Sequence, residues 1–333
     1  MKFLITGVNG FIGSNLAKKL VESNHQVRGF ILEGTDESNL ADIEDKIEKV
    51  YGDVTVPNSI RPHLQDIDVV IHLAALLLDW GPEKLIMKVN YEGTKNVLDS
   101  AVGAGVKRFV AMSSLTVHDF KGFQNADEST PYAPYNAYAR SKKAVEDLLN
   151  TYYSHKKIES VIVRPGFTIF GPHDRLFSLE AYKRIEAGKS FPLVNKGQSL
   201  MCYSYVENLV DGLILVSTHP KAAGQTYIIS DGPIITFREL IEQMFLAAGQ
   251  TPKLSSFPSW LAYPAAAILT AFYKLVRSKT APLITFYRVK VASTDLGFTN
   301  EKIVRELGYN ATISLEEAFK RTYEWCKREL NKN

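Results

Sequence analysis

The sequence predicts an α/β fold: a doubly wound parallel sheet with helices on both faces, followed by a smaller C-terminal lobe. In the first half of the chain, short apolar or β-branched runs alternate with longer helical patterns, as they do in βαβ units. These runs are almost continuously apolar, which is typical of strands covered by helices on both faces. The length of 333 residues is enough for one large α/β domain and an appended lobe.

Each element follows from its local pattern. In the first part we expect helices at 11–23, 84–104 and 138–154, and strands at 3–6, 26–32, 47–51, 68–72, 108–112 and 160–164. Beyond residue 175, loops rich in Gly and Pro break the pattern, and we expect a strand at 225–229 and helices at 182–188, 207–217, 237–248 and 314–330. The sequence thus predicts a first domain at 1–174 and a packed lobe at 175–333 that returns some segments to the sheet.

Composition and charge exclude several classes of protein. The 39 Lys and Arg residues against 36 Asp and Glu residues give a net charge of +3. With 45% hydrophobic and 23% charged residues, the chain is an ordinary globular one rather than disordered or collagenous. The sequence has no basic block, so we expect no nucleic-acid partner held by bulk positive charge.

The two cysteines, Cys202 and Cys326, lie far apart and lack the spacing of metal ligands, so we expect no metal site. They give no reason to expect a disulfide, and a reducing cytoplasm is the expected compartment. The apolar run near the amino terminus is too short for a signal peptide, so no secretion is implied.

Residues 254–273 are twenty residues without a charge, between Lys253 and Lys274. A bilayer span needs about 20 apolar residues, but this stretch contains three serines and two prolines. The composition favours a helix buried against the lobe or lining a pocket. A helix that lies on a membrane surface through residues 257–276 is the second interpretation, and a true span is the third.

A glycine-rich turn follows the first predicted strand, with its glycines three residues apart. In such a turn one glycine allows the bend, one lets phosphates approach the backbone, and one lets the helix press onto the sheet. The free N–H groups at the start of the helix then face a pyrophosphate. The sequence therefore predicts a dinucleotide site at Gly7, Asn9, Gly10, Phe11, Ile12 and Gly13.

The motif TGxxGFIG resembles that of the extended short-chain dehydrogenase/reductase family, within the NAD-dependent epimerase/dehydratase superfamily. Later matches to the family pattern are GDV at 52–54, HLAA at 72–75 and VNYEGT at 89–94. The resemblance implies a Rossmann sheet with NAD or NADP as cofactor. It also implies cofactor contacts from Leu32, Asp53, Val54, Leu73, Ala74, Ala75, Asn90, Tyr138, Lys142, Pro165 and Gly166.

The choice between NAD and NADP depends on the end of the second strand. An acidic side chain there binds the ribose 2′-hydroxyl, whereas an arginine pairs with a 2′-phosphate. Ile31 and Leu32 occupy the positions where relatives carry these residues, so neither signal is present. Glu33 would repel a 2′-phosphate, which favours NAD slightly and leaves NADP open.

Tyr138 and Lys142 are four residues apart in a predicted helix, so both side chains project from one face. A free tyrosine has a pKa of about 10, and moving it to about 7 needs roughly 4 kcal/mol of preferential phenolate stabilisation. A neighbouring ammonium and a positively charged nicotinamide supply this in a shielded cleft. The pair is therefore a candidate acid/base, in which Lys142 also holds the nicotinamide ribose.

Two hydroxyl residues, Ser114 and Thr116, follow the fifth predicted strand in the run SSLTV. In the family, a strand-end hydroxyl at this place hydrogen-bonds the reacting oxygen. The resemblance implies that Ser114, Tyr138 and Lys142 are catalytic and that Thr116 and Asn90 are auxiliary.

Apolar residues are expected around the substrate, and the lobe is expected to supply most of its walls. The segment 164–172 resembles the family's RPxxxYGP segment with one extra residue. The lobe is most similar to those of 3β-hydroxysteroid dehydrogenases and dihydroflavonol-4-reductase-like enzymes. An apolar pocket with a few polar anchors suits a hydrophobic alcohol or ketone. The expected substrate residues are Leu76, Trp80, Phe167, Phe177 and Tyr205.

These features predict an NAD(P)-dependent oxidoreductase that transfers a hydride between nicotinamide and a secondary alcohol or ketone on a sterol- or flavonoid-like substrate. A nucleotide-sugar 4-epimerase is the alternative, with Arg175 and Lys183 as candidate diphosphate ligands. A sugar dehydratase is disfavoured, because Leu115 and Thr116 occupy the place of its acidic pair. A non-catalytic NAD(P)-binding sensor or scaffold is also open, although it would have no need of the tyrosine.

In relatives, the helix that carries the catalytic tyrosine often pairs across a dimer. A homodimer through residues 138–154 is therefore a further expectation, and the other is that this helix has one face on the sheet and one in water.

Overall fold

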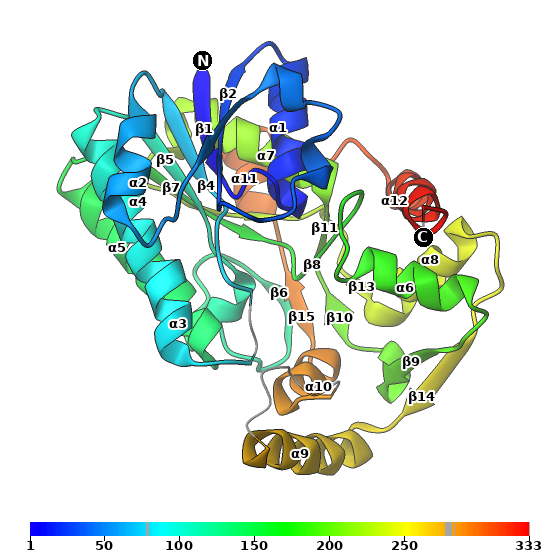
Figure 1. Ribbon diagram of the computed structural model, residues 1–333. Coiled ribbons are helices and arrows are strands. Elements are labelled where there is room, and N and C mark those ends of the chain that lie inside the picture. The colour runs from blue at the N-terminus through cyan, green and yellow to red at the C-terminus, as the bar shows by residue number, and fades with distance from the viewer. Residues whose placement is uncertain (78–79, 277–281, 283, 333) are drawn as a thin grey trace.

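The computed structural model describes residues 1–77, 80–276, 282 and 284–332 (Figure 1). Its centre is a seven-stranded parallel sheet with the strand order β12-β7-β5-β4-β1-β2-β3. The strands are β1 (Lys2–Thr6), β2 (Gln26–Ile31), β3 (Glu48–Tyr51), β4 (Val69–His72), β5 (Arg108–Met112), β7 (Glu159–Pro165) and β12 (Thr226–Ile229). The predicted doubly wound sheet is confirmed. The strand expected at 225–229 is β12, which pairs with β7 and forms one edge of the sheet.

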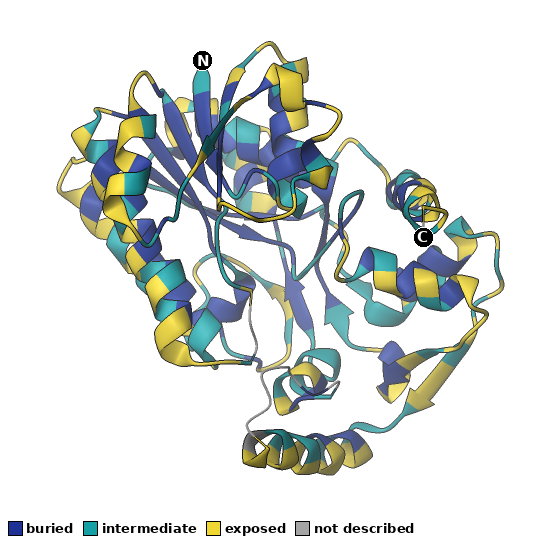
Figure 2. Cartoon of the chain, in the orientation of Figure 1, coloured by how far each residue is buried: buried dark blue, intermediate teal, exposed yellow. Residues whose placement is uncertain are grey.

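Helices cover both faces of this sheet, because successive strand residues point to opposite sides. Phe3 and Ile5 of β1 pack with one buried cluster, which includes residues of α1 (Phe11–Glu22) and α7 (Val206–Thr218). Leu4 belongs to the other cluster, which includes residues of α4 (Gly93–Gly103) and α5 (Ala137–Ser154). The two helical layers bury the central strands, which are dark blue in Figure 2. The buried sheet supports the loops at its carboxyl edge.

The helix expected at 84–104 is composite. It consists of α3 (Glu83–Met87), a π-helical turn η4 (Lys88–Glu92) and α4. A π turn inserts one residue into the helical ladder, which a regular period of 3.6 residues does not reveal. The other short helices of this part are η1 (Ser38–Leu40), η2 (Glu44–Lys46), α2 (Pro57–Ile60), η3 (Arg61–Leu64) and η5 (Leu115–Val117).

The rest of the chain forms a lobe below and beside the carboxyl edge of the sheet (Figure 1). A four-stranded sheet has the order β13-β10-β15-β6, and two smaller sheets pair β11 with β8 and β14 with β9. The strands are β6 (Phe123–Ala126), β8 (Thr168–Phe170), β9 (Phe191–Val194), β10 (Leu200–Met201), β11 (Tyr203–Tyr205), β13 (Ile235–Thr236), β14 (Leu254–Phe257) and β15 (Leu296–Phe298). The helices of the lobe are α6 (Ser178–Glu186), η6 (Asn195–Gly197), α8 (Phe237–Ala247), α9 (Ser259–Leu275), α10 (Phe286–Ala292) and α12 (Leu315–Leu330). The remaining two, η7 (Pro220–Ala222) and α11 (Glu301–Leu307), return to the central sheet, where α11 packs against β12.

The structure of the uncharged segment 254–273 differs from the buried helix that its composition favours. The segment forms β14, which pairs with β9, and most of α9, on which Trp260, Ile268 and Phe272 are exposed. The prediction of a helix buried against the lobe is therefore wrong for α9, because its buried residues are small alanines. Among the residues that the structure describes, no helix combines the length and hydropathy needed to cross a bilayer.

Candidate active site

Two adjoining cavities lie at the carboxyl ends of β1, β4 and β5, where the strand order of the sheet reverses. The larger encloses about 460 Å³ and the smaller about 340 Å³. Both are lined by Gly7, Asn9, Ala74 and Ala75, so together they form one elongated space. In open α/β sheets, ligands bind at such a reversal point.

The glycine turn fits a pyrophosphate. Gly7 has φ +70° and its carbonyl accepts a hydrogen bond from Gly10 N at 3.0 Å. A Cβ on Gly13 would lie 2.2 Å from the carbonyl oxygen of Gly7, so only glycine lets α1 begin there. Among the residues that the structure describes, no side chain caps the start of α1, and the first N–H groups of this helix remain available to an anion. Gly7, Asn9, Gly10, Phe11, Ile12 and Gly13 all line the larger cavity, as predicted.

Gly10→Ala is expected to weaken cofactor binding by at least about tenfold, the equivalent of one charge-assisted hydrogen bond worth about 1.5 kcal/mol. A Cβ there would lie 3.2 Å from Gly7 O, at the surface that faces the pyrophosphate. Fluorescence titration with NADH and NADPH measures the effect. Gly103→Ala, whose Cβ would meet nothing within 4 Å, is the matched control. Equal affinity in the two variants would contradict this position for the pyrophosphate.

The smaller cavity contains the residues expected at the adenosine end. Leu32, Asp53, Val54 and Leu76 all line it. Asp53 accepts a hydrogen bond from Thr55 N at 2.8 Å, which fixes its carboxylate at the wall. Among the described lining residues, Asp53 and Lys88 are the only charged ones. Glu33 is exposed and does not line this cavity.

Tyr138 and Lys142 point into the larger cavity from α5, next to Ser114. Asn136 caps the helix, because its side chain accepts a hydrogen bond from Ala139 N at 2.8 Å. This fixes the first turn, in which Tyr138 lies. Burial raises the pKa of Tyr138, and its hydrogen bond with Ser114 opposes that rise. The phenol is therefore protonated at neutral pH in the chain alone.

Lys142 is buried, and its Nζ donates a hydrogen bond to Met112 O at 2.7 Å, which ties α5 to the end of β5. Its Nζ lies 5.7 Å from the centroid of the Tyr138 ring. Burial lowers the pKa of Lys142 to about 8, against the opposing effect of the Glu146 carboxylate. The ammonium is thus poised near neutrality, beside the phenol that it would activate.

Ser114 has its hydroxyl direction set by Thr116. Its Oγ accepts hydrogen bonds from Thr116 N at 3.2 Å and Thr116 Oγ1 at 3.0 Å. With its oxygen occupied in this way, the Ser114 hydroxyl proton is left to donate toward Tyr138 or a substrate oxygen. Thr116 lines the same cavity, and its expected auxiliary role stays a prediction.

Asn90 lies behind the cavity rather than in its lining. Its Oδ1 accepts from Leu76 N at 2.7 Å, and its Nδ2 donates to Leu76 O at 3.1 Å and to Ser141 Oγ at 3.0 Å. These bonds use both amide hydrogens, and Asn90 lines neither cavity, so its expected contact with the cofactor stays a prediction. Asn90 acts as a positioning residue that joins the loop after β4 to the helix of Tyr138.

A buried ionic network lies directly behind Ser114, and the sequence interpretation missed it. Glu146, one turn beyond Lys142, accepts from Ser113 Oγ at 2.5 Å and from Arg164 at 2.9 and 2.6 Å. Tyr132 donates its hydroxyl to Glu146 at 2.8 Å. The Arg164 and Glu146 side chains are 1% and 0% exposed. The network therefore fastens the end of β5, α5 and β7 together around the catalytic groups.

Apolar side chains form the outer part of the larger cavity. Phe167 lines it as predicted, together with Leu77, Met112, Leu115, Ile169 and Tyr287. Two predicted substrate residues lie elsewhere: Tyr205 is fully buried and bonds Glu207, and Phe177 packs against the core. Trp80 is half-buried outside the lining, and Leu76 faces the smaller cavity. Tyr287 had no signal in the sequence, because α10 reaches the site from far along the chain.

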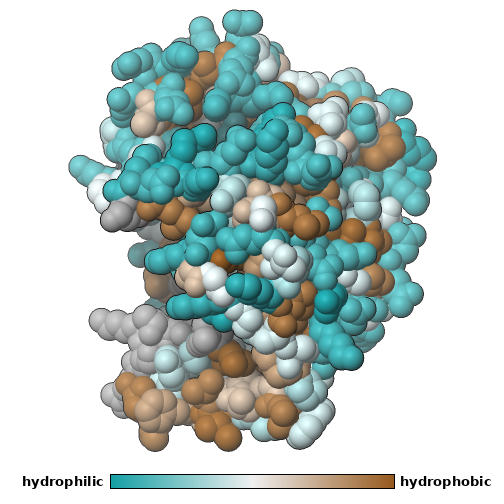
Figure 3. Space-filling view, turned by 90° about the vertical axis from the view of Figure 1, so that its right-hand side faces the viewer, coloured by the Kyte–Doolittle hydropathy of each residue, from teal (hydrophilic) through white to brown (hydrophobic). Residues whose placement is uncertain are grey.

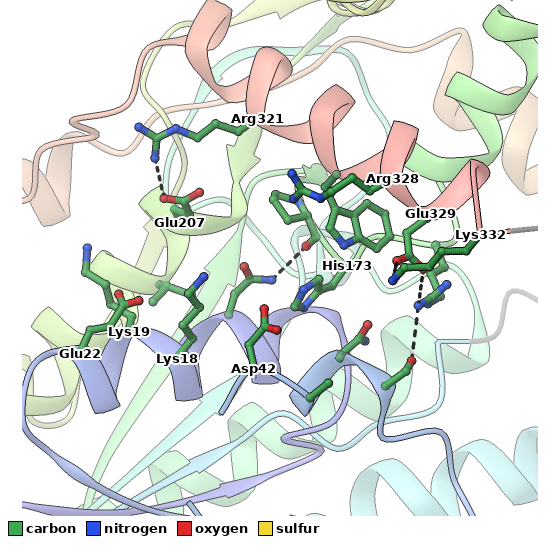
Figure 4. A pocket seen from close by; sticks show the side chains of 18 residues that line it. Lys18, Lys19, Glu22, Asp42, His173, Glu207, Arg321, Arg328, Glu329 and Lys332 are labelled. Atoms are coloured by element: carbon green, nitrogen blue, oxygen red, sulfur yellow. Dashed lines mark hydrogen bonds and ion pairs between the residues drawn. The ribbon is translucent and has the colours of Figure 1, made fainter. Parts of the chain in front are cut away.

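A larger hollow, of about 670 Å³, lies between α1 and α12 and contains none of the predicted catalytic or cofactor residues (Figure 4). Two ion pairs lie in this hollow: Arg175 bonds Glu329 at 2.9 Å, and Arg321 bonds Glu207 at 2.9 Å. Arg175 therefore lines this hollow and not the catalytic cavity. Lys183, the other expected diphosphate ligand, is exposed and 3.9 Å from Glu180.

Comparison with known proteins agrees with this geometry. The sequence model of the NAD dependent epimerase/dehydratase family matches residues 3–230. The 3β-hydroxysteroid-dehydrogenase/decarboxylase isoform 1 of Arabidopsis thaliana is 29% identical, over 96% of this chain and 78% of the relative. The 2-alkyl-3-oxoalkanoate reductase of Shewanella oneidensis is 27% identical, over 95% of this chain and 84% of the relative.

Among solved structures, the dTDP-glucose 4,6-dehydratase of Streptomyces venezuelae, solved with NAD bound, is 23% identical. It superposes with a TM-score of 0.80 and covers 99% of this chain and 98% of its own. At this identity the likeness concerns the fold alone.

Proposed function

The chain belongs to the NAD dependent epimerase/dehydratase family, and on this basis we propose that it transfers a hydride between NAD(P) and a secondary alcohol or ketone on a hydrophobic substrate. One observation carries the proposal: Ser114, Tyr138 and Lys142 share a cavity whose outer wall is apolar. The relatives whose names describe hydroxysteroid dehydrogenation and oxoalkanoate reduction support this substrate class. Sterol- or flavonoid-like ring systems and long alkyl ketones have the required hydrophobic surface.

The chain's own residues supply orientation and a proton. NAD(P), held by the glycine turn, Ala74, Ala75, Pro165, Gly166 and Lys142, would supply or accept the hydride when bound. In the direction of ketone reduction, Ser114 donates a hydrogen bond to the carbonyl oxygen and Tyr138 donates its proton to that oxygen. In the reverse direction, the Tyr138 oxygen takes the hydroxyl proton, and the Lys142 ammonium stabilises the phenolate.

The rate of ketone reduction is expected to fall above pH 8, because Lys142 has its pKa lowered to about 8. A lowered lysine pKa means that the positive charge is present below that pH and is lost as pH rises through it. Lys142→Arg keeps its charge throughout this range. A kcat–pH profile should therefore show the falling limb at higher pH in Lys142→Arg, even if its maximum rate is lower. If the falling limb of the profile stayed at the same pH in Lys142→Arg, the loss of rate would belong to another titrating group.

A panel of hydrophobic ketones, each incubated with NADH or NADPH, tests the proposal. The decrease in absorbance of the reduced nicotinamide measures turnover of each ketone. The proposal is supported if the enzyme reduces sterol, flavonoid or alkyl ketones and does not reduce small polar ketones. Turnover of a UDP-sugar, with no activity on the panel, would establish the 4-epimerase instead. Tight cofactor binding without turnover of any member would establish a sensor or scaffold. The described lining of the catalytic cavity carries Lys142 as its only cation, which disfavours a diphosphate-bearing substrate.

We also propose a reducing, cytoplasmic compartment, supported by two free and buried thiols, Cys202 and Cys326. A homodimer through α5 stays a prediction. Its outward face carries the ion pairs Lys143–Asp147 and Arg140–Glu83, at 2.6 and 2.8 Å, and sedimentation velocity over a range of concentrations tests it.

A further inference from the structure

Helix α9 has the reverse of the usual arrangement of a surface helix. The side chains it buries are small, with Ala262 3% and Ala266 0% exposed. The side chains it exposes are large: Trp260 is 70%, Ile268 69% and Phe272 56% exposed. A soluble surface helix places its bulky apolar residues inward and polar ones outward. We name the outward residues Trp260, Leu261, Ile268, Phe272 and Leu275 the apolar stripe.

The stripe is continuous along one side of the helix. Leu261, Ile268, Phe272 and Leu275 recur at the spacing of successive helical turns. In Figure 2 the outer edge of α9 is exposed along its length, and in Figure 3 hydrophobic side chains gather at that end of the molecule. Isolated exposed apolar residues are ordinary, but a contiguous apolar patch marks a surface that another phase or molecule covers.

The surrounding sequence has a strong charge bias. Residues 243–294 contain no Asp or Glu and six basic residues: Lys253, Lys274, Arg277, Lys279, Arg288 and Lys290. Since the whole chain carries +3, the remainder of the chain carries a net −3. The positive charge is therefore concentrated in the segment that bears the stripe. An apolar face on a segment of the chain with a net positive charge complements an anionic lipid surface, which offers hydrocarbon below and negative headgroups above.

The stripe lies on the far side of a helix pair from the catalytic cavity. Ala262 and Ala266 pack with Val289 of α10, and Tyr263 bonds Ser293 through its hydroxyl at 3.1 Å. Tyr287, on the same short helix α10, lines the catalytic cavity. The apolar outer surface and the apolar cavity wall are thus separated by the pair of helices α9 and α10.

We propose that α9 docks the protein on the surface of an anionic lipid bilayer, lying in the plane of the membrane with the stripe in the headgroup–acyl boundary. A helix of 17 residues lies flat there and does not need to cross. A lipid surface fits better than a second copy of this chain, because a bilayer accepts a convex apolar ridge without a matching groove. Under the proposed function, this position would bring an apolar substrate close to the cavity. That delivery rests on the proposed function, whereas docking does not.

Vesicle flotation of the full chain tests the proposal. The probe is phosphatidylcholine vesicles with phosphatidylglycerol added, compared with phosphatidylcholine alone. The wild type should float with the mixed vesicles, and less with phosphatidylcholine alone or at high salt. The triple variant Trp260→Ser, Ile268→Ser, Phe272→Ser should partition at least about 100-fold less, because each bulky apolar side chain buried contributes about tenfold. The matched control Leu176→Ser, Leu246→Ser, Val304→Ser removes three exposed apolar side chains elsewhere and should bind like the wild type.

Three results would overturn docking. The wild type would remain unbound, or the stripe triple and the matched control would bind alike, or binding would ignore the anionic lipid. A wild type that dimerises in sedimentation while the stripe triple stays monomeric, without vesicle binding, would assign the stripe to a second copy. Tyr138→Phe should bind vesicles like the wild type, so a failure of the proposed chemistry would leave this result intact.

Discussion

Tyr138→Phe is expected to lower kcat for ketone reduction by about 10³-fold, because positioned acid–base groups contribute about 10²–10⁴-fold. The substitution removes only the hydroxyl, so the shape of the cavity and the hold on the cofactor should persist. NADH titration should therefore give an affinity close to that of the wild type, while steady-state turnover is lost. The separation of binding from rate is what identifies Tyr138 as the proton donor.

Tyr135→Phe is the matched control for this loss. Tyr135 lies near the same cavity, with its ring 6.3 Å from that of Tyr287, but it is 43% exposed and does not line the cavity. Its variant should turn over at nearly the wild-type rate. Comparable activity in Tyr138→Phe and Tyr135→Phe would remove the phenol from the mechanism.

Glu146→Gln is expected to destabilise the fold by about 3–5 kcal/mol, because it leaves a buried guanidinium without its counter-charge. Arg164 donates to both Glu146 oxygens and to Tyr132, and the buried Arg164 and Glu146 side chains cannot reach water to compensate. For a chain of this size, the loss corresponds to a fall in Tm of about 5 °C. Differential scanning calorimetry measures it.

Asp147→Asn provides the comparison on the same helix. Asp147 is 61% exposed and pairs with Lys143 at 2.6 Å, so its loss should cost less than about 1 kcal/mol. Because Glu146 also holds Ser113, the Glu146→Gln enzyme should lose turnover at temperatures where it is still folded. Equal melting temperatures for the two variants would show that the buried pair contributes no more than a surface pair.

The cofactor cradle and the catalytic groups could be predicted because local sequence determines them. The turn from Gly7 to Gly13 requires its glycines for steric reasons, and Tyr138 and Lys142 share a helix face by spacing alone. Glu146 was also within reach, since an acidic residue one turn beyond Lys142 on a packed face needs a partner. Arg164, the one charged residue among the six buried residues of β7, was the signal for that partner.

The substrate wall could not be predicted in the same way, because it depends on how the lobe folds back. Tyr287 reaches the cavity from α10, whereas Tyr205, an expected substrate residue, is buried in the core and Phe177 packs against the core. The same holds for α9: its apolar composition predicts a helix, but only the packing against α10 decides which side is buried.

Deuterium transfer tests the central claim most directly. NADH or NADPH with both hydrogens of the reactive nicotinamide carbon replaced by deuterium is incubated with the enzyme and a hydrophobic ketone, and the product alcohol is examined by mass spectrometry. Hydride transfer at this site predicts one deuterium on the carbon that bears the new hydroxyl, and about 10³-fold slower formation of this labelled alcohol with Tyr138→Phe. An alcohol without deuterium, or a bound cofactor that keeps its label in the presence of every ketone tested, would contradict the account.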